Sequence, residues 1–194
     1  MIDISHSLEI PGFMAPNELE WLAEKAQGRK FVAEVGCWMG RSSKALAEQC
    51  DGRVLCVDTW KGCAELDHLT PDGAPDNWMY TNWLYYTQGS KNVIACHMPS
   101  LHAAERLLNY GMWIGDEFIK MPAFDMVFID GLHDYENVKA DILAWMPCVV
   151  DGGILCGHDF HHPPVRQAYR ELFGAEHETL HPDTRMWEVE VHWQ

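Results

Sequence analysis

The sequence predicts an α/β fold, a three-layer sandwich in which helices cover both faces of a mostly parallel sheet. Short apolar runs of strand length alternate with segments whose apolar residues recur at helical spacing. The tail from Trp187 to Trp193 alternates apolar with polar residues, which indicates an antiparallel C-terminal strand. Since 47% of the 194 residues are hydrophobic and 22% are charged, we expect one domain, residues 1–194.

These patterns also give the order of the elements. Residues 1–30 form an N-terminal helical segment, in which Pro16 opens a helix and Gly28 ends it. The expected strands are 31–35, 54–58, 93–96, 124–130 and 154–156, and the expected helices are 41–50, 100–108, 134–145 and 164–173. The tail strand is expected to pair antiparallel with residues around 176–181.

Two stretches, 61–90 and 109–122, interrupt the alternation and are interpreted as inserts. Glycines and prolines break the periodicity of the first, which is rich in Trp and Tyr and is expected to be a loop plus a short helix. The second is expected to be irregular. Either insert is a candidate lid, and the alternative is that the aromatic residues only pack the first insert onto the body of the domain.

Composition narrows the possible partners. Lys plus Arg is 14 against 29 for Asp plus Glu, and the net charge of −15 argues against nucleic acid as a partner. No apolar run is long enough to span a membrane, and the N-terminus lacks the basic start and apolar core of a signal peptide, so we expect a cytoplasmic protein. Seven cysteines without a C-x-x-C pair favour reduced thiols. Nine tryptophans would suit a homo-oligomer surface.

The segment from Phe31 to Ser43 carries the strongest functional signal. It has the pattern of a buried strand, a glycine turn and a helix start, which in doubly wound folds places a ligand at the strand end. Trp38 occupies the middle position, where a dinucleotide site has a glycine to admit the pyrophosphate. Glu34 would repel a phosphate but can accept a hydrogen bond from an ammonium group.

Asp58, at the end of the next strand, completes the pattern. It lies 18 residues beyond Gly40, a position suited to holding the two hydroxyls of a ribose. S-adenosylmethionine has a ribose, an amino group and a sulfonium but no phosphate, so it fits these residues better than NAD. The alternative for Glu34 and Asp58 is that they are solvated strand ends.

With these motifs in order, residues 10–192 resemble a class I S-adenosylmethionine-dependent methyltransferase. Residues 34–43 resemble the first motif, 57–60 the second, and 128–135 and 151–159 the motifs of the fourth and fifth strands. The resemblance implies a Rossmann-like sandwich. It also implies cofactor contacts from Glu34, Gly36, Trp38, Gly40, Ser42, Ser43, Asp58, Thr59, Trp60, Ser100 and Asp130.

The most similar subgroup includes macrocin O-methyltransferase and related sugar O-methyltransferases. This resemblance implies a divalent metal held by Asp130, His158 and Asp159, with His133 as general base. His158 stands where the subgroup has an acidic residue, and imidazole suits a softer ion than Mg²⁺. The alternatives are cap and turn roles for the two aspartates and a backbone hydrogen bond for His133.

The resemblance therefore implies O-methylation of a small hydroxylated, sugar-like molecule with metal assistance. His158, His161 and His162 with Asp159 also resemble a zinc cluster, although adjacent histidines usually point apart and no fourth spaced ligand is evident. Two other functions stay open. One is an NAD-dependent oxidoreductase, and the other is a non-catalytic, partner-binding protein with the same fold.

Overall fold

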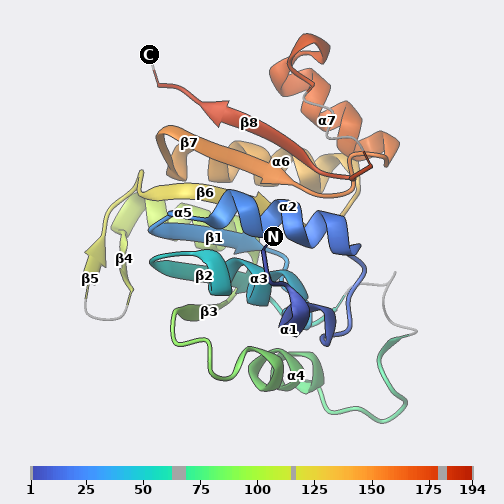
Figure 1. Ribbon diagram of the computed structural model, residues 1–194. Helices are drawn as coiled ribbons and strands as arrows, with labels where there is room; N and C mark the ends of the chain where they lie inside the picture. The colour runs from blue at the N-terminus through green and yellow to red at the C-terminus, as the bar shows by residue number, and fades with distance from the viewer. Residues whose placement is uncertain (1, 63–68, 115–116, 179–182, 194) are drawn as a thin grey trace.

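The computed structural model describes residues 2–62, 69–114, 117–178 and 183–193, and its centre is a six-stranded sheet (Figure 1). The strand order is β3-β2-β1-β6-β7-β8. The first five are parallel, and β8 runs antiparallel to β7. The strands are β1 (Phe31–Val35), β2 (Arg53–Asp58), β3 (Val93–His97), β6 (Phe124–Ile129), β7 (Val149–Gly157) and β8 (Trp187–Val191).

Helices cover both faces of the sheet, as Figure 1 shows. The helices that pack on one apolar core are α1 (Ser5–Leu8), α2 (Pro16–Ala26), α3 (Arg41–Gln49) and α4 (Trp78–Thr87). Those that pack on the other are α5 (Ser100–Tyr110), α6 (Tyr135–Trp145) and α7 (Pro163–Phe173). Two short 3₁₀ turns, η2 (Met146–Cys148) and η3 (Ala175–His177), follow α6 and α7. The predicted α/β sandwich is confirmed.

Two local expectations differ from the structure. The tail strand pairs with β7 and not with residues around 176–181: residues 175–177 form a 3₁₀ turn, and 179–181 lie outside the described residues. The 109–122 insert contains a two-stranded hairpin, β4 (Met112–Ile114) and β5 (Glu117–Ile119). The short helix expected in the 61–90 insert is α4. Residues 63–68 of that insert also lie outside the described part.

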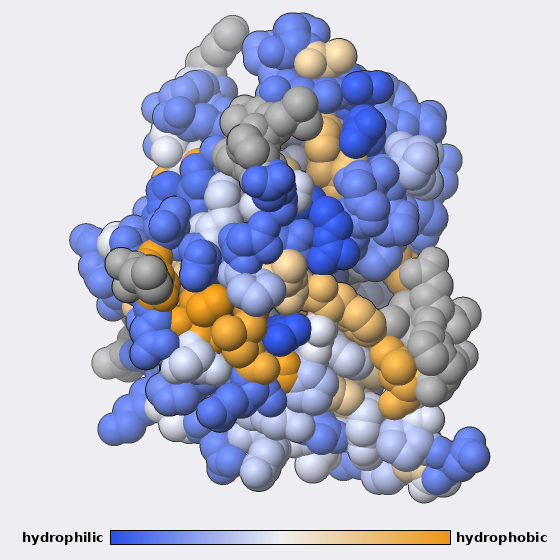
Figure 2. Space-filling model, turned by 45° about the vertical axis from the view of Figure 1, so that its right-hand side comes forward, coloured by the Kyte–Doolittle hydropathy of each residue, from blue (hydrophilic) through white to orange (hydrophobic). Residues whose placement is uncertain are grey.

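Some large apolar side chains are exposed on the surface. On the face shown in Figure 2, hydrophobic surface forms a band between hydrophilic regions. Phe13, Tyr110 and Trp113 are each more than half exposed. Within the described ranges, no helix combines the length and apolar character needed to cross a membrane.

The carboxyl ends of β1 and β6 approach so closely that only glycine fits between them. Gly36 has φ +87°, and a Cβ built on it would lie 2.2 Å from the carbonyl oxygen of Asp130. The Asp130 N–H in turn donates to the Val35 carbonyl at 2.8 Å. This contact brings the glycine turn and the loop after β6 to one edge of the sheet.

We therefore expect Gly36→Ala to lower the free energy of unfolding by about 3 kcal/mol or more, because it adds a backbone clash to left-handed strain. Gly28→Ala is a matched control, since Gly28 has φ +73° but nothing within 4 Å of the added Cβ. It should cost only about 1 kcal/mol. Urea denaturation without ligand measures both, and equal costs would contradict the close approach.

Candidate active site

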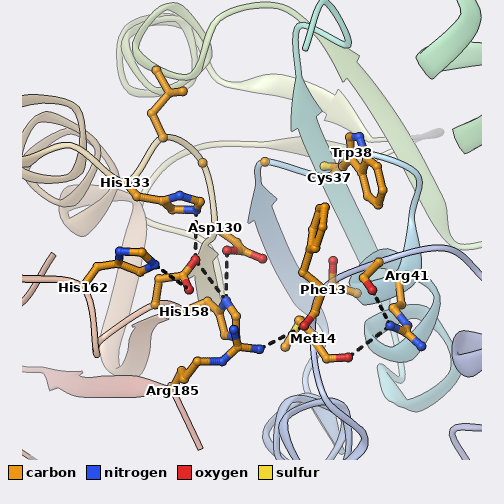
Figure 3. Close-up of a pocket in the computed structure, with 16 residues that line it drawn as sticks. Phe13, Met14, Cys37, Trp38, Arg41, Asp130, His133, His158, His162 and Arg185 are labelled. Atoms are coloured by element: carbon orange, nitrogen blue, oxygen red, sulfur yellow. Dashed lines mark hydrogen bonds and ion pairs between the residues drawn. The ribbon is translucent and has the colours of Figure 1, made fainter. Parts of the chain in front are cut away.

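A cavity of about 300 Å³ opens at the carboxyl ends of the central strands. Its walls come from the loops after β1, β6 and β7 and from the N-terminal segment 12–14. Figure 3 shows two sides to it: a cluster of charged and imidazole side chains on one, and the stacked rings of Phe13 and Trp38 on the other. Parallel strands deliver their loops to one edge, which is why three sequence motifs meet here.

The glycine turn is held in shape by the carboxylate of Asp58. Its Oδ2 accepts the backbone N–H groups of Cys37 at 2.8 Å and Trp38 at 3.0 Å, and its Oδ1 accepts that of Trp60 at 2.7 Å. Trp38 adopts φ +42°, a left-handed conformation that costs energy for a bulky residue. The indole of Trp60 donates to the Trp38 carbonyl at 3.0 Å. Trp38 is thus held in the turn from two directions.

Residues 12–14 of the N-terminal segment line the cavity next to the glycine turn. Phe13 stacks on Trp38 with ring centroids 4.9 Å apart. The guanidinium of Arg41 donates to the backbone carbonyls of Ser7, Gly12 and Met14. Arg41 directly follows the glycine turn. The turn lines one wall of the cavity, and Arg41 holds the N-terminal segment that lines another.

The predicted cofactor-binding residues fall into two groups. Gly36, Trp38, Ser42 and Asp130 line the cavity. The others do not: Glu34, Gly40, Ser43, Asp58, Thr59, Trp60 and Ser100. Thr59 and Trp60 line a second hollow with residues 70–80 and His97. Ser100 joins α5 to α6, because its hydroxyl donates to Asp141 and accepts from the Trp145 indole.

Glu34 was expected to meet a cationic ligand, but the structure places its carboxyl in the core. The residue is fully buried, and one of its oxygens accepts from the Ser43 hydroxyl. Burial raises the pKa of Glu34 to about 7, so the carboxyl is partly protonated near neutral pH. Ser43 also accepts the Trp83 indole N–H at 3.1 Å. These groups form a buried polar network beneath α3, and the geometry provides no direct contact between Glu34 and a ligand in the cavity.

His133 and Asp159 form the closest imidazole–carboxylate pair in the polar cluster. His133 Nε2 lies 2.9 Å from Asp159 Oδ2, and the His133 side chain is about one-third exposed. Burial alone would raise the pKa of Asp159, but hydrogen bonds from His133 and His158 outweigh it and hold that pKa well below its usual range. Asp159 is therefore an ionised acceptor at any working pH. It has φ +58°, a strained conformation that aims its carboxylate at the cluster.

His158 lies among three carboxylates and is almost fully buried. Its Nδ1 is 3.5 Å from Asp130 Oδ1 and 3.2 Å from Asp159 Oδ2. Its Nε2 is 3.2 Å from Glu18 Oε2, without the alignment of a hydrogen bond. Burial lowers the pKa of this imidazole, but the three carboxylates outweigh that effect and raise the pKa to about 11. His158 is thus an imidazolium, the internal cation of the cluster.

Glu18 and Arg185 belong to the site although sequence reasoning did not identify either. Arg185 donates to Glu18 from its backbone N–H and from two guanidinium nitrogens, at 3.0, 2.7 and 2.7 Å. Arg185 Nη2 also donates a hydrogen bond to the Phe13 carbonyl at 2.9 Å. Glu18 also accepts the Ala15 N–H at 2.7 Å, the usual bond of an acidic residue in a first helical turn. An acidic residue in the first turn of a helix is the only sequence signal for Glu18. No local pattern predicts its partner Arg185, which is 167 residues away.

The predicted metal set, Asp130, His158 and Asp159, brings its ligand atoms together but fits a divalent cation poorly. A protonated imidazole has no lone pair to donate, so an ion could bind His158 only by displacing its proton. Among the described residues, three other groups of ligand atoms lie within 4.8 Å of one another: Asp130 with His133 and Asp159, Asp159 with His161 and His162, and the buried Glu34 with Cys37 and Cys56. The pKa of His161 is lowered by burial and by the neighbouring His162, which keeps its ring neutral.

Comparison with known proteins places the chain in a family. A family model described as a methyltransferase domain matches residues 33–160. A search of curated protein sequences found no match. Among solved structures, an O-methyltransferase from Bacillus cereus in complex with SAH is similar, with a TM-score of 0.62 and 18% identity over 98% of this chain and 92% of that one.

Two further structures share the fold. The O-methyltransferase TomG from Streptomyces achromogenes, in complex with SAM, has a TM-score of 0.65 and 14% identity over 98% of this chain and 86% of that one. CalS11, described as a TDP-rhamnose 3′-O-methyltransferase, has a TM-score of 0.60 and 15% identity over 89% and 77%. At these identities the similarity establishes the fold.

The charge of His158 gives a pH-dependent test of the cluster. Because its folded pKa lies above the unfolded value of 6.5, its stabilisation is complete below about pH 6.5 and is lost as the pH rises toward 11. The difference in unfolding free energy between wild type and His158→Gln should therefore shrink by on the order of 2 kcal/mol from about pH 6.5 to about pH 9. Urea denaturation with EDTA present measures it. A pH-independent difference would mean that His158 is neutral in the folded protein.

Proposed function

This chain belongs to the methyltransferase domain family, and we propose that it is an S-adenosylmethionine-dependent O-methyltransferase acting on a small hydroxylated, sugar-like molecule. The observation that carries the proposal is the pairing of His133 with Asp159 in the cavity that the glycine turn borders. A base and a nucleoside-binding turn in one cavity are what methyl transfer to a hydroxyl requires.

The His133–Asp159 pair supplies the base. An Nε2–H donated to Asp159 leaves the lone pair of the ring on Nδ1, the atom that can take a proton from a hydroxyl. The ionised Asp159 fixes the ring orientation and stabilises the imidazolium that forms. S-adenosylmethionine bound in the cavity would supply the methyl group from its sulfonium, and the acceptor hydroxyl would have to be held in line with that methyl group beside His133. The hydroxyl proton passes to His133.

The turn and the loop after β6 suit a cationic cofactor without phosphate. The Trp38 side chain fills the position where a pyrophosphate would need open backbone. The partly exposed carboxylate of Asp130 attracts the sulfonium and amino groups. Asp58 shapes the turn through three backbone hydrogen bonds, and a carboxylate oxygen with one such bond retains capacity to accept from a ribose hydroxyl.

Divalent-metal assistance remains a prediction, and the steps above do not depend on it. If an ion displaced the proton of His158, it would be held by Asp130, His158 and Asp159 and would lower the pKa of a bound hydroxyl. For the acceptor, the support is the shared fold with CalS11, whose description names a sugar nucleotide.

The two alternative functions are not favoured. Trp38 and the methyltransferase family match count against an NAD-dependent oxidoreductase. A non-catalytic, partner-binding protein has no need of a strained Asp159 that orients a histidine in a cavity.

Cofactor binding is tested by calorimetry with S-adenosylhomocysteine. We expect wild type to bind it and Trp38→Ala to weaken binding roughly tenfold, because the ring that forms the cavity wall is lost. Trp113→Ala is the matched control, since Trp113 is exposed on the distant hairpin and should bind as wild type. Absence of binding to wild type, or tighter binding of NAD, would overturn the cofactor assignment.

The base is tested once an acceptor is found in a panel of deoxysugar nucleotides and simple polyols. His133→Gln should lower kcat about 10²- to 10⁴-fold while S-adenosylhomocysteine still binds. His177→Gln, at an exposed histidine remote from the cavity, should leave kcat unchanged. If His133→Gln turns over like wild type, His133 is not the base.

A further inference from the structure

The short segment after β7 folds Asp159, His161 and His162 onto one another. The His162 N–H donates to the Asp159 carbonyl at 2.8 Å, which closes a tight turn. Asp159 takes its left-handed conformation at the start of that turn. Adjacent histidines usually point apart, but here the two rings lie with centroids only 4.2 Å apart. The turn therefore presents two imidazoles and one carboxylate together.

The ligand atoms have the spacing of groups around a common ion. His161 Nδ1 is 3.7 Å and His162 Nε2 is 3.8 Å from Asp159 Oδ1, too long for direct hydrogen bonds. All three atoms lie within 4.8 Å of one another. Tetrahedral ligands about 2.1 Å from a metal lie roughly 3.4 Å apart, so shifts of a few tenths of an ångström would bring both imidazole nitrogens and the carboxylate oxygen onto one ion. From this geometry we propose that Asp159, His161 and His162 bind a divalent transition-metal ion.

The donor set defines the class of ion. Two imidazoles and one carboxylate suit zinc, cobalt, iron or nickel, whereas Mg²⁺ prefers oxygen ligands and retains its waters. Three protein ligands leave coordination positions open for water or another oxygen ligand, as in catalytic metal sites. Among the residues that the structure describes, no fourth ligand atom joins this group, which fits an open site. Both histidine side chains are about half exposed, so an ion can reach them.

This site is separate from the base because the two oxygens of Asp159 face different partners. Oδ2 faces His133 and His158, while Oδ1 faces His161 and His162. An ion on the Oδ1 side leaves the His133–Asp159 pair intact.

His162 lines the cavity, and its ring stacks on that of His133 at 5.7 Å (Figure 3). The open positions of the ion would thus lie at the cavity rim beside the base, where an acceptor oxygen can bind. That last step rests on the proposed function, but the metal site does not.

Cobalt is the probe, because Co²⁺ bound to imidazole nitrogen absorbs visible light. Untagged, EDTA-treated and dialysed full-length protein is titrated with Co²⁺ and followed by absorption and calorimetry, without cofactor or acceptor. We expect one Co²⁺ per chain and no displacement by excess Mg²⁺. The double variant His161→Gln/His162→Gln should lose affinity roughly 100-fold.

Two controls keep the test specific. The double variant His177→Gln/His192→Gln removes two histidines that also lie near carboxylates, and it should bind Co²⁺ like wild type. His133→Gln should retain the ion; if it loses binding while His161→Gln/His162→Gln retains it, the ion uses Asp130, His133 and Asp159 instead and the proposal is wrong. No binding to wild type, or equal loss in both double variants, also overturns it.

Circular dichroism confirms that each variant is folded. Calorimetry with S-adenosylhomocysteine, run separately on the same samples, distinguishes failure of the metal site from failure of the proposed function. Loss of one binding activity with retention of the other identifies which of the two assignments is wrong.

Discussion

Charge balance around His158 is the constraint on which the cavity depends. Glu18, Asp130 and Asp159 bring three carboxylates to the edge of the sheet, and two of them are buried. Buried charges are tolerated only when paired, so the imidazolium of His158 and the guanidinium of Arg185 are required there. These contacts also join α2, the residue after β7 and the segment before β8, so one electrostatic cluster holds three segments together beside the cavity.

In the same cluster, the carboxylate of Asp159 contacts several imidazoles, each at a defined oxygen. Asp159 is strained, ionised and flanked by imidazoles on both oxygens. Because His158 has a second carboxylate on its far side, it stays protonated and holds Oδ2 in place. His133 then meets an acceptor of fixed position and charge. The orientation of the proposed base is thus set by Asp159 and, through Asp159, by His158.

How much of the fold and the site could be predicted from the sequence depends on how far apart in the chain the interacting residues are. Apolar periodicity and the glycine turn are local, so the sheet, most of the helices and the convergence of Gly36, Asp130, His133 and Asp159 could be predicted. Glu34 was misplaced because both faces of the sheet are covered. The alternation of β1 therefore sends its carboxyl under α3 instead of toward solvent or ligand. The Glu18–Arg185 pair joins opposite ends of the chain, and no short pattern encodes such a contact.

His158 also determines on which side of the Asp159 carboxylate a bound metal ion is favourable. Here three carboxylates face two cations, so the cluster retains only one net negative charge. A divalent ion beside the His158 imidazolium would be repelled by it. The Oδ1 side of Asp159 is different. The imidazoles of His161 and His162 there are partly exposed, and the Asp159 carboxylate lies between them and His158. The His158 imidazolium therefore disfavours a metal ion between Asp130 and Asp159, and the proposed site on the Oδ1 side of Asp159 is the more favourable one.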